Sequence, residues 1–295
     1  MLTLEQRERR FALLCIAPSV LLVLCLIVYP VAFTLWLSLQ QRDLFASSGT
    51  FIGLNNYVYW LGSAEFWNSF WNGVIFSGGT IALQTILGVT LALLLNRPFV
   101  GQSFARGALL FPYLIPSVVG ILLLRWMLND LYGIVNAWLT QLGLIAAPIP
   151  WFGDPDWAMA SLIGINTWMF YPFVMLCVLA RLQSIPRELY EAAHMDGAGP
   201  FAQFRYVTLP QIRGTLALVL LVRTLWMFNK FDTVWLTTGG GPFGSTQTLP
   251  VLTYLRAFSL YELGRGAAVG ILLSLTLVGV FAVYYRSLVR GPETR

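Results

Sequence analysis

The residues with the clearest chemical potential lie close together in an otherwise apolar stretch of the chain. Arg223, Lys230 and Asp232 are ionisable, and Asn229 adds an amide between them. An ionisable side chain deep in a membrane span costs about 2.5–3.5 kcal/mol on insertion scales, so such residues usually mark a pathway or a binding site. These side chains are therefore candidates for contact with a solute or with a second subunit.

Arg223 shares one face of its predicted helix with three later residues. These are Trp226, Met227 and Lys230, which follow it at helical spacing. We expect this face to point into a helix bundle, with Asp232 roughly opposite Arg223. Whether Lys230 and Asp232 bind a ligand or only reach the outer interface stays open, as does a role for Arg223 between subunits.

A second group of candidates lies in the apolar run near residue 168, which contains Asn166, Trp168, Tyr171 and Pro172. Aromatic rings stack on the apolar faces of sugars, while an amide or guanidinium binds hydroxyl groups, so these residues suit a carbohydrate. Ordinary packing of the aromatic rings is the alternative. Gln84 could equally join two helices or touch a ligand.

The chain shows no catalytic constellation and no metal site. The sole histidine, His194, has no Cys or His at metal-ligand spacing. Gly239–Ser245 has the two glycines of a phosphate-binding loop, but no lysine precedes its hydroxyl residue. We therefore expect that this chain binds no cofactor and does not itself hydrolyse a nucleotide. An intramembrane serine hydrolase would need a histidine at membrane depth, and His194 lies in a polar loop.

Composition places the protein in the membrane. Hydrophobic residues make up 57% and charged residues 11% of the 295 positions, and mean hydropathy is +0.71. Soluble domains have about 25% charged residues. The net charge of +5 is therefore an orientation signal rather than evidence of nucleic-acid binding.

Hydropathy predicts an all-α polytopic membrane protein with six transmembrane helices in one domain, 1–295. Each apolar run approaches or exceeds the roughly 20 residues that a span requires. Pro112 and Pro116 fall inside the third run, where neighbouring helices could satisfy the freed carbonyl groups. The predicted spans are 11–37, 67–95, 107–129, 157–180, 214–236 and 265–285, with a long loop at 181–213.

Arginines predict the orientation of these spans. Twelve lie in the two tails and in the loops 96–106 and 181–213, against three in the opposite loops. Basic residues accumulate on the cytoplasmic side. Both termini and the 181–213 loop are therefore expected in the cytoplasm.

The 181–213 loop should contain two short helices. Ser184 could cap the first, Pro186 suits its opening turn, and Asp196-Gly197 should end it, since glycine accepts the left-handed conformation there. Pro200 should start a second, partly apolar helix that lies outside the bilayer. Such a helix could insert into a groove on a soluble partner.

This loop resembles the EAA loop of the membrane subunits of bacterial ABC importers. The resemblance rests on Glu191-Ala192-Ala193, Gly197 and Leu209-Pro210 at the spacing of that motif, with Val207 where isoleucine is frequent. In that family the second helix of the loop docks on an ATPase subunit, here through residues 198–208. The resemblance thus implies ATPase coupling by Glu191, Ala192, Ala193, Gly197, Phe201, Phe204, Arg205, Leu209 and Pro210.

The segment Gly239-Gly240-Gly241-Pro242, with Thr246 downstream, further resembles the carbohydrate branch, that is, maltose-importer-like permeases. The spans that flank the EAA loop line the substrate passage in those proteins. The pathway candidates are accordingly Asn166, Trp168, Tyr171, Arg223, Met227, Asn229, Lys230 and Asp232.

The resemblance implies a type I ABC importer permease fold in the bacterial inner membrane. The chain would form half of a carbohydrate or polyol pathway that works by alternating access. Implied partners are membrane lipid, a second homologous permease, an external substrate-binding protein and two ATPase subunits that hold ATP and Mg²⁺, with no nucleic acid.

Two alternatives remain at this point. The stripe from Arg223 to Lys230 could bind an anionic sugar derivative, such as a sugar phosphate or a sulfonated sugar. A stand-alone secondary carrier, with Arg223 and Asp232 in ion coupling, would leave the EAA spacing unexplained.

Overall fold

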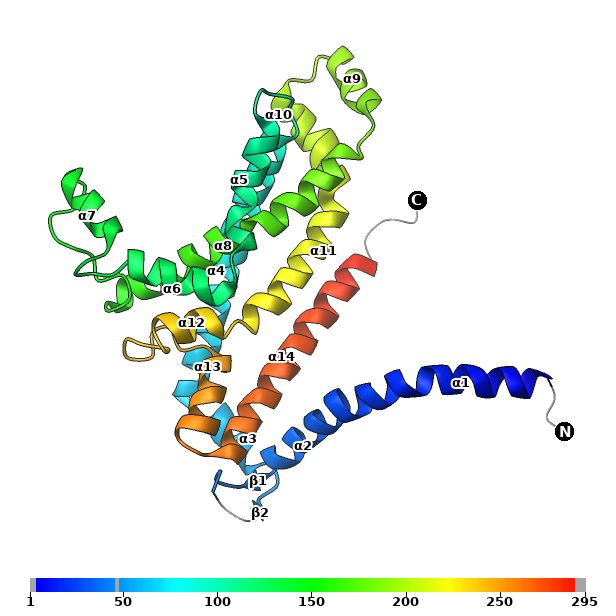
Figure 1. Ribbon diagram of the computed structural model, residues 1–295, viewed down its shortest axis with the longest axis vertical. Coiled ribbons are helices and arrows are strands. Elements are labelled where there is room, and N and C mark those ends of the chain that lie inside the picture. The colour runs from blue at the N-terminus through cyan, green and yellow to red at the C-terminus, as the bar shows by residue number, and fades with distance from the viewer. Residues whose placement is uncertain (1–3, 46–47, 290–295) are drawn as a thin grey trace. The chain divides into compact units, whose positions relative to one another are not determined.

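The computed structural model describes residues 4–45 and 48–289, and most of this part of the chain is helical (Figure 1). The helices and π-helical turns (η) are α1 Leu4–Val23, η1 Leu24–Val28, α2 Tyr29–Ser38, α3 Asn55–Leu61, α4 Ala64–Leu95, α5 Gln102–Leu114, α6 Ser117–Met127, α7 Ile134–Gln141, α8 Pro155–Gln183, α9 Arg187–Met195, α10 Pro200–Gln203, η2 Phe204–Thr208, α11 Leu209–Phe228, α12 Asp232–Thr237, α13 Leu249–Tyr254, η3 Leu255–Ser259 and α14 Leu263–Val289. Two short antiparallel strands, β1 Gln40–Gln41 and β2 Thr50–Phe51, pair Gln40 with Phe51.

Five helices of the described chain are long and apolar enough to cross a membrane, and a sixth span results if the bent pair α5–α6 counts as one. The expected all-α class is confirmed. Contacts divide the chain into two compact units. The first contains the described residues before Ala64 together with Leu252–Ser274, and the second contains Ala64–Val251 and the described residues from Leu275 onward.

The core of the second unit lies where α4 packs against α8. Ala92 and Leu95 from α4 are buried against Val174 and Val178 from α8, and Ile212 from α11 joins them. Small residues allow helix backbones to approach closely in membrane proteins. Gly88 has this role, because a Cβ atom added there would lie 2.7 Å from Cβ of Val174.

The third predicted span is broken rather than straight. α5 and α6 meet at an angle of 94°, with Ile115 in an extended conformation before Pro116. A proline disfavours the helical conformation of the residue before it. Pro112, in contrast, lies inside α5, so only the second proline ends a helix.

The fifth predicted span differs from the structure at both ends. α10, η2 and α11 follow one another with helical backbone at each junction, so the helix begins at Pro200 rather than at 214. It ends at Phe228, and a new helix, α12, starts at Asp232. The sequence-based expectation of a separate short helix before the span is therefore wrong.

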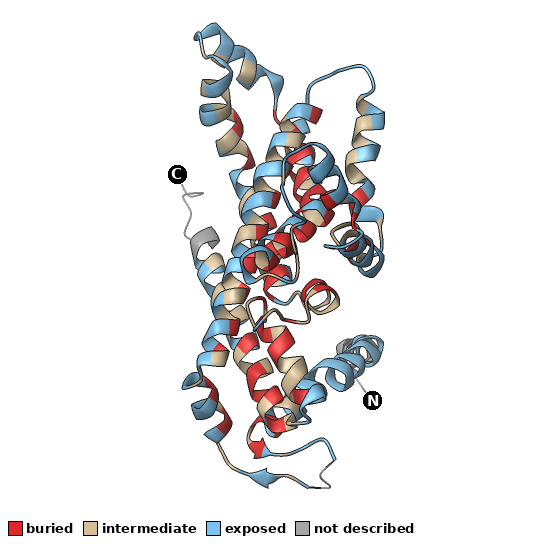
Figure 2. Ribbon diagram, turned by 90° about the vertical axis from the view of Figure 1, so that its left-hand side faces the viewer, coloured by how far each residue is buried: buried red, intermediate tan, exposed pale blue. Residues whose placement is uncertain are grey.

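In the first unit, α1, η1 and α2 form an apolar helix whose side chains from Ala12 to Phe33 are all exposed. In Figure 2 most of this helix is pale blue, whereas Leu37 and Ser38 at its end are buried. Its window Ala12–Ser38 has a mean hydropathy of 2.7. Such a surface requires lipid or another protein around it.

We expect Gly88→Ala to destabilise the second unit, because the added methyl group must displace Val174. Overpacking of this kind costs about 1–3 kcal/mol. Gly78→Ala on the same helix is the matched control, since no atom lies within 4 Å of its added Cβ, and it should be neutral or slightly stabilising. Thermal unfolding in detergent measures both variants, and equal midpoints would contradict the close approach.

Candidate functional site

A cleft of about 460 Å³ opens where α11 ends and α12 begins. The helical backbone is interrupted at residues 229–231. The polar side chains of Asn229, Lys230 and Asp232 at this break line the cleft. The lining residues are Tyr113, Phe170, Arg223, Leu225, Trp226, Met227, Asn229, Lys230, Phe231 and Asp232.

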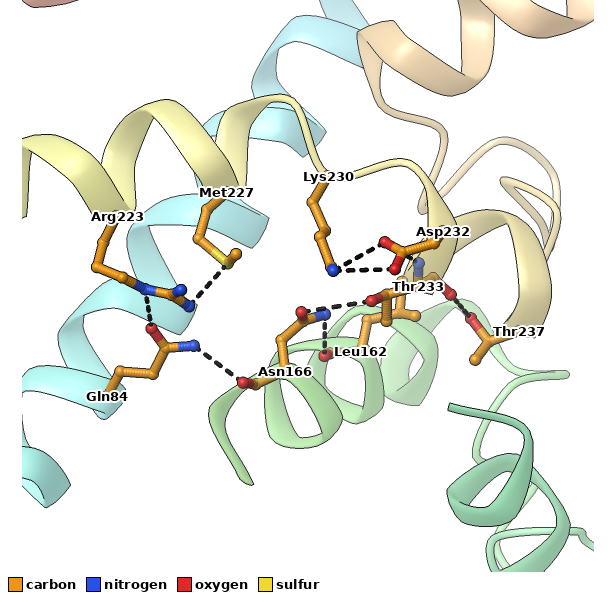
Figure 3. A network of polar contacts seen from close by, with 9 residues as sticks. All are labelled: Gln84, Leu162, Asn166, Arg223, Met227, Lys230, Asp232, Thr233 and Thr237. Carbon is orange, nitrogen blue, oxygen red and sulfur yellow. Dashed lines mark hydrogen bonds and ion pairs between the residues drawn. The ribbon is translucent and has the colours of Figure 1, made fainter. Parts of the chain in front are cut away.

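Arg223 is the most deeply buried charge of this cleft, with 1% of its surface exposed. Its Nε donates a hydrogen bond to Oε1 of Gln84 at 2.9 Å, and one terminal nitrogen contacts Sδ of Met227 at 3.5 Å (Figure 3). Among the described residues no carboxylate lies within ion-pair distance of it. Its positive charge is therefore not neutralised by an acidic side chain.

Aromatic rings replace the missing carboxylate. The guanidinium carbon lies 5.2 Å from the ring centroid of Phe170, 5.9 Å from that of Phe173 and 5.7 Å from that of Trp226. Each ring face attracts a cation by about 0.5–2 kcal/mol, with the larger values in dry surroundings.

A chain of hydrogen bonds connects Arg223 to α4, α8 and α12. Gln84 accepts from Arg223 and donates from Nε2 to the carbonyl of Asn166 at 2.9 Å. The side chain of Asn166 then accepts from the hydroxyl of Thr233 at 3.3 Å. Figure 3 shows these residues in one continuous network across the helices.

Lys230 and Asp232 form an ion pair at the other end of this network, with 3.0 Å between Nζ and a carboxylate oxygen. Asp232 also accepts a hydrogen bond from the amide of Thr233, and Nζ of Lys230 lies 4.5 Å from the ring centroid of Phe170. Phe170 therefore contacts both cations of the cleft. The two charges of the pair cancel, which leaves Arg223 as the net charge of the lining.

This arrangement suits binding rather than catalysis. The cleft offers aromatic faces, an amide, an ammonium group and a carboxylate, which together recognise hydroxyl groups and the apolar faces between them. No group of three or more His, Cys, Asp or Glu residues suited to a metal ion occurs in the part of the chain that the structure describes.

The structure brings five pathway candidates to the cleft: Arg223, Met227, Asn229, Lys230 and Asp232. Asn166 is fully buried behind them in the network. The other two candidates lie elsewhere. Trp168 lines a separate apolar pocket of about 290 Å³, and the hydroxyl of Tyr171 donates to the carbonyl of Leu109 at 2.9 Å, which is a packing role.

The expectation that Asp232 points away from Arg223 is wrong, because both residues line the same cleft. The expected direction of Asp232 was calculated for one continuous helix, but α11 ends at Phe228 and Asp232 begins a new helix. Sequence reasoning also missed Tyr113, Phe170 and Phe231. Phe170 lies four residues after Asn166 and so shares its helical face, a signal that was available.

The loop between α8 and α11 holds the remaining candidates. α9 ends as expected at Asp196-Gly197, and Gly197 has a φ of 77°. Its amide donates to the carbonyl of His194 at 3.0 Å. Ser184 does not cap α9. It ends α8, where its hydroxyl donates to the carbonyl of Arg181 at 2.8 Å.

Two contacts fasten this loop to the helices below it. Arg181 donates to the carbonyl of Gln211 at 2.9 Å and to its side-chain oxygen at 3.0 Å, which joins the end of α8 to the start of α11. The hydroxyl groups of Tyr190 and Thr208 lie 3.0 Å apart. The first contact therefore joins the helices on either side of the loop, and the second joins α9 to η2.

Large side chains of the loop nevertheless remain exposed. Met195 is 86%, Phe201 80% and Tyr206 76% exposed. Glu191, Ala192 and Arg205 are exposed as well, whereas Ala193, Phe204 and Leu209 are half-buried. An apolar surface fixed in this way is typical of a protein contact.

Comparison with known proteins places the chain in a family. Residues 84–291 match the binding-protein-dependent transport system inner membrane component. The chain belongs to this family. It is thus a multi-pass membrane permease component of a binding-protein-dependent transport system, as the EAA loop indicated.

Two relatives are similar over most of their length. The trehalose/maltose transport system permease protein MalF of Thermococcus litoralis is 36% identical over 96% of this chain and 94% of its own. The sulfoquinovosyl glycerol transport system permease protein SmoG of Agrobacterium fabrum is also 36% identical, over 96% of this chain and 92% of its own.

A solved structure shows the fold of this permease. A chain of a bacterial ABC transporter involved in the import of the acidic polysaccharide alginate matches it with a TM-score of 0.83 and 22% identity, over 97% of this chain and 98% of that one. The expected ABC importer permease fold is confirmed.

We expect Gln84→Leu to destabilise the permease by about 1.5–3 kcal/mol, the usual worth of a hydrogen bond to a charged group. The variant leaves the guanidinium of Arg223 without its oxygen acceptor. Gln84→Glu is the matched variant, because it supplies a carboxylate to Arg223 at the same place but loses the hydrogen bond to the carbonyl of Asn166, and it should be less destabilising than Gln84→Leu.

A double-mutant cycle with Arg223→Met tests the contact directly. The Gln84→Leu and Arg223→Met changes together should cost less than the sum of the two single changes, since neither partner is then left alone. Additive losses of thermal stability in detergent would mean that the contact contributes nothing.

Proposed function

We propose that this permease forms one half of the translocation pathway for a carbohydrate or polyol, driven by ATP hydrolysis in separate subunits. The observation that carries the proposal is the cleft at the end of α11. It places Asn229, Lys230 and Asp232 beside the rings of Tyr113, Phe170 and Trp226. The trehalose/maltose permease of Thermococcus litoralis, by its name, supports a sugar as the solute.

The chemistry of the cleft suits weak, reversible binding of a sugar. A hydroxyl group can donate to Asp232 and accept from Lys230 without leaving either charge unpaired, because the two are only 3.0 Å apart. Aromatic rings cover the apolar faces of the same molecule. A transporter should bind its solute only weakly, because the solute must also be released.

An anionic sugar derivative is the second candidate, and a specific observation favours it. Arg223 lines the cleft without a carboxylate partner in the described chain, and guanidinium groups bind phosphate or sulfonate well. The similarity to the sulfoquinovosyl glycerol permease of Agrobacterium fabrum points the same way. The stand-alone secondary carrier, in contrast, has no support from the family.

We infer that the loop from Arg187 to Thr208 couples the permease to an ATPase. In this mechanism an ATPase subunit receives the exposed Phe201 and its neighbours, through residues 198–208, and supplies ATP and Mg²⁺. Closure of two ATPase subunits moves the loop, and the continuous helix from Pro200 to Phe228 carries the movement to the cleft. Access to the cleft then alternates between the two sides.

The proposed assembly contains a second homologous permease and an external binding protein that delivers the solute. The exposed helix of α1, η1 and α2 would face lipid or the second permease. Both termini and the coupling loop would lie in the cytoplasm of a bacterium, as the excess of arginines on that side suggests.

The deciding experiment is purification from the native membrane in mild detergent, followed by ATP hydrolysis assays with neutral and anionic sugars. An ATPase and a second permease should co-purify, and one sugar with its binding protein should stimulate hydrolysis. Purification of a lone chain whose uptake follows an ion gradient would overturn the proposal.

We expect Asp232→Asn to reduce sugar uptake by at least about tenfold, because Lys230 loses its partner and becomes a second net cation in the cleft. Subunit assembly and basal ATP hydrolysis should persist. Gln141→Leu, at the exposed end of α7, is the control and should transport normally. Normal uptake by Asp232→Asn would exclude the ion pair from the pathway.

Asp232→Asn also separates the two substrate classes. An added net positive charge should favour an anionic solute over a neutral one, so the ratio of their uptake rates should shift toward the anion. A neutral sugar as the sole solute of both the natural chain and the variant would eliminate the anionic candidate.

We expect Gly197→Val to abolish uptake and to release or uncouple the ATPase. The φ of 77° at this residue costs about 1–2 kcal/mol for a residue with a Cβ atom, and more for a β-branched one. Glu191→Lys should act similarly by reversing a charge on the proposed contact. Gly214→Ala, where no atom lies within 4 Å of the added Cβ, should remain active. Normal solute-stimulated ATP hydrolysis and transport in Gly197→Val would contradict the coupling assignment.

A further inference from the structure

The guanidinium of Arg223 has fewer hydrogen-bond acceptors than it can use. The group carries five N–H donors, and in the described chain it donates only to Oε1 of Gln84 and to Sδ of Met227. Arginine typically binds carboxylate or phosphate groups through two parallel hydrogen bonds. The wall of the cleft therefore contains the chemistry of an anion site, yet this arginine is only 1% exposed.

The ring of Phe170 occupies one side of this guanidinium. Its centroid lies 5.2 Å from Cζ of Arg223 and 4.5 Å from Nζ of Lys230, so one ring from α8 contacts both cations of the cleft. An oxyanion has to come within about 2.7–2.9 Å of a guanidinium nitrogen to form a charge-assisted hydrogen bond. Where the ring is in contact with the guanidinium, that space is already taken.

Packing fixes the position of this ring. Phe170 is half-buried, and the ring of Tyr113 meets it edge to face, with 6.3 Å between the centroids. It also packs against a buried cluster of Ile121, Ile165 and Met169. The ring is therefore part of the cleft wall before any solute enters.

A second ring on the same helix provides a comparison. Phe173 lies 5.9 Å from Cζ of Arg223 and is also half-buried, but it does not line the cleft. Both phenylalanines thus contact the guanidinium. They differ in that Phe170 also faces the space that a solute can occupy.

We infer that Phe170 is the specificity-determining residue of the cleft, and that its ring excludes anionic solutes by occupying the place of an oxyanion beside Arg223. Lys230 is neutralised by Asp232 at 3.0 Å, so it does not replace Arg223 as an anion site. The natural chain accepts neutral hydroxylated solutes, which meet the exposed Asn229 and the ion pair. This inference deepens the proposed function and rests on it in one respect, that the cleft is where the solute binds.

The test measures direct binding to the full-length permease, with the subunits that co-purify, in lipid nanodiscs without ATP or binding protein. Trehalose and trehalose 6-phosphate are the probes, because they differ by a single phosphate group. Radiolabelled probe and a scintillation proximity assay give the two affinities for each variant, at one ionic strength so that screening of charge is constant.

Phe170→Leu should raise the affinity for trehalose 6-phosphate by at least about tenfold, because the freed space lets a phosphate oxygen reach the guanidinium. The affinity for trehalose should change less. Phe170→Met, whose flexible side chain fills more of the space, serves the same purpose if the leucine variant does not fold.

Three further variants are the controls. Phe170→Tyr keeps a ring at the same place and should behave as the natural chain. Phe173→Leu removes a ring from Arg223 outside the cleft lining and should give no gain. Adding Arg223→Met to Phe170→Leu should abolish the gain, because the guanidinium is the group that binds the phosphate.

Several results would overturn the inference. One is an unchanged affinity for trehalose 6-phosphate in both Phe170→Leu and Phe170→Met, and another is a natural chain that already prefers this probe to trehalose. An equal gain in Phe173→Leu would assign the effect to a general loosening of the rings, and a gain that survives Arg223→Met would assign it to Lys230. Absence of trehalose binding by the natural chain counts against the proposed function alone, because the gain in anion affinity is measured separately.

Discussion

The amide of Gln84 is the contact on which the centre of the second unit depends. It accepts from Arg223 of α11 and donates to the backbone of Asn166 in α8, so a single side chain on α4 fixes two neighbouring helices. Polar contacts between membrane helices contribute only about 0.6 kcal/mol on average. The cost of losing this one is larger, because a guanidinium with 1% exposure would keep its charge without an oxygen acceptor. The contact lies beside the cleft, because Arg223 is one of the residues that line it.

The same helix connects the cleft to the loop at its other end. From Pro200 to Phe228 the backbone is helical without interruption over 29 residues, which at about 1.5 Å per residue is roughly 40 Å. The π-helical turn η2 precedes Pro210, and its wider hydrogen-bond spacing helps to accommodate a residue that has no amide hydrogen. Arg181 and Tyr190 hold the loop end, and Gln84 holds the cleft end. The uninterrupted helix is one element between the loop and the cleft, which is the property that the proposed coupling would require.

Sequence was sufficient where a local signal decides the structure. Hydropathy located the apolar helices, Gly197 marked the end of α9 because a left-handed residue was needed there, and the EAA spacing identified the family.

The sequence was insufficient where a contact between residues far apart in the chain determines the structure. The break at residues 229–231 has no glycine or proline to announce it, so the direction of Asp232 was predicted from a helix that does not exist. The burial of Tyr171 depends on its hydrogen bond to Leu109 of α5, which no pattern within α8 reveals. Of the two prolines in the third span, only Pro116 lies at the break, and Pro112 lies inside α5.

The electrostatics of the cleft favour a neutral solute in the observed conformation. One terminal nitrogen of Arg223 contacts only the sulfur of Met227, and a thioether is a weak acceptor. An oxyanion would be a better partner, yet the guanidinium is almost fully buried, so it offers little surface to a solute in the cleft. Asn229 is exposed, and Lys230 and Asp232 are partly exposed, so these three side chains offer more surface to hydroxyl groups. Of the two proposed solutes, a neutral carbohydrate would therefore depend on the more accessible side chains of the cleft, and an anionic one on the buried Arg223.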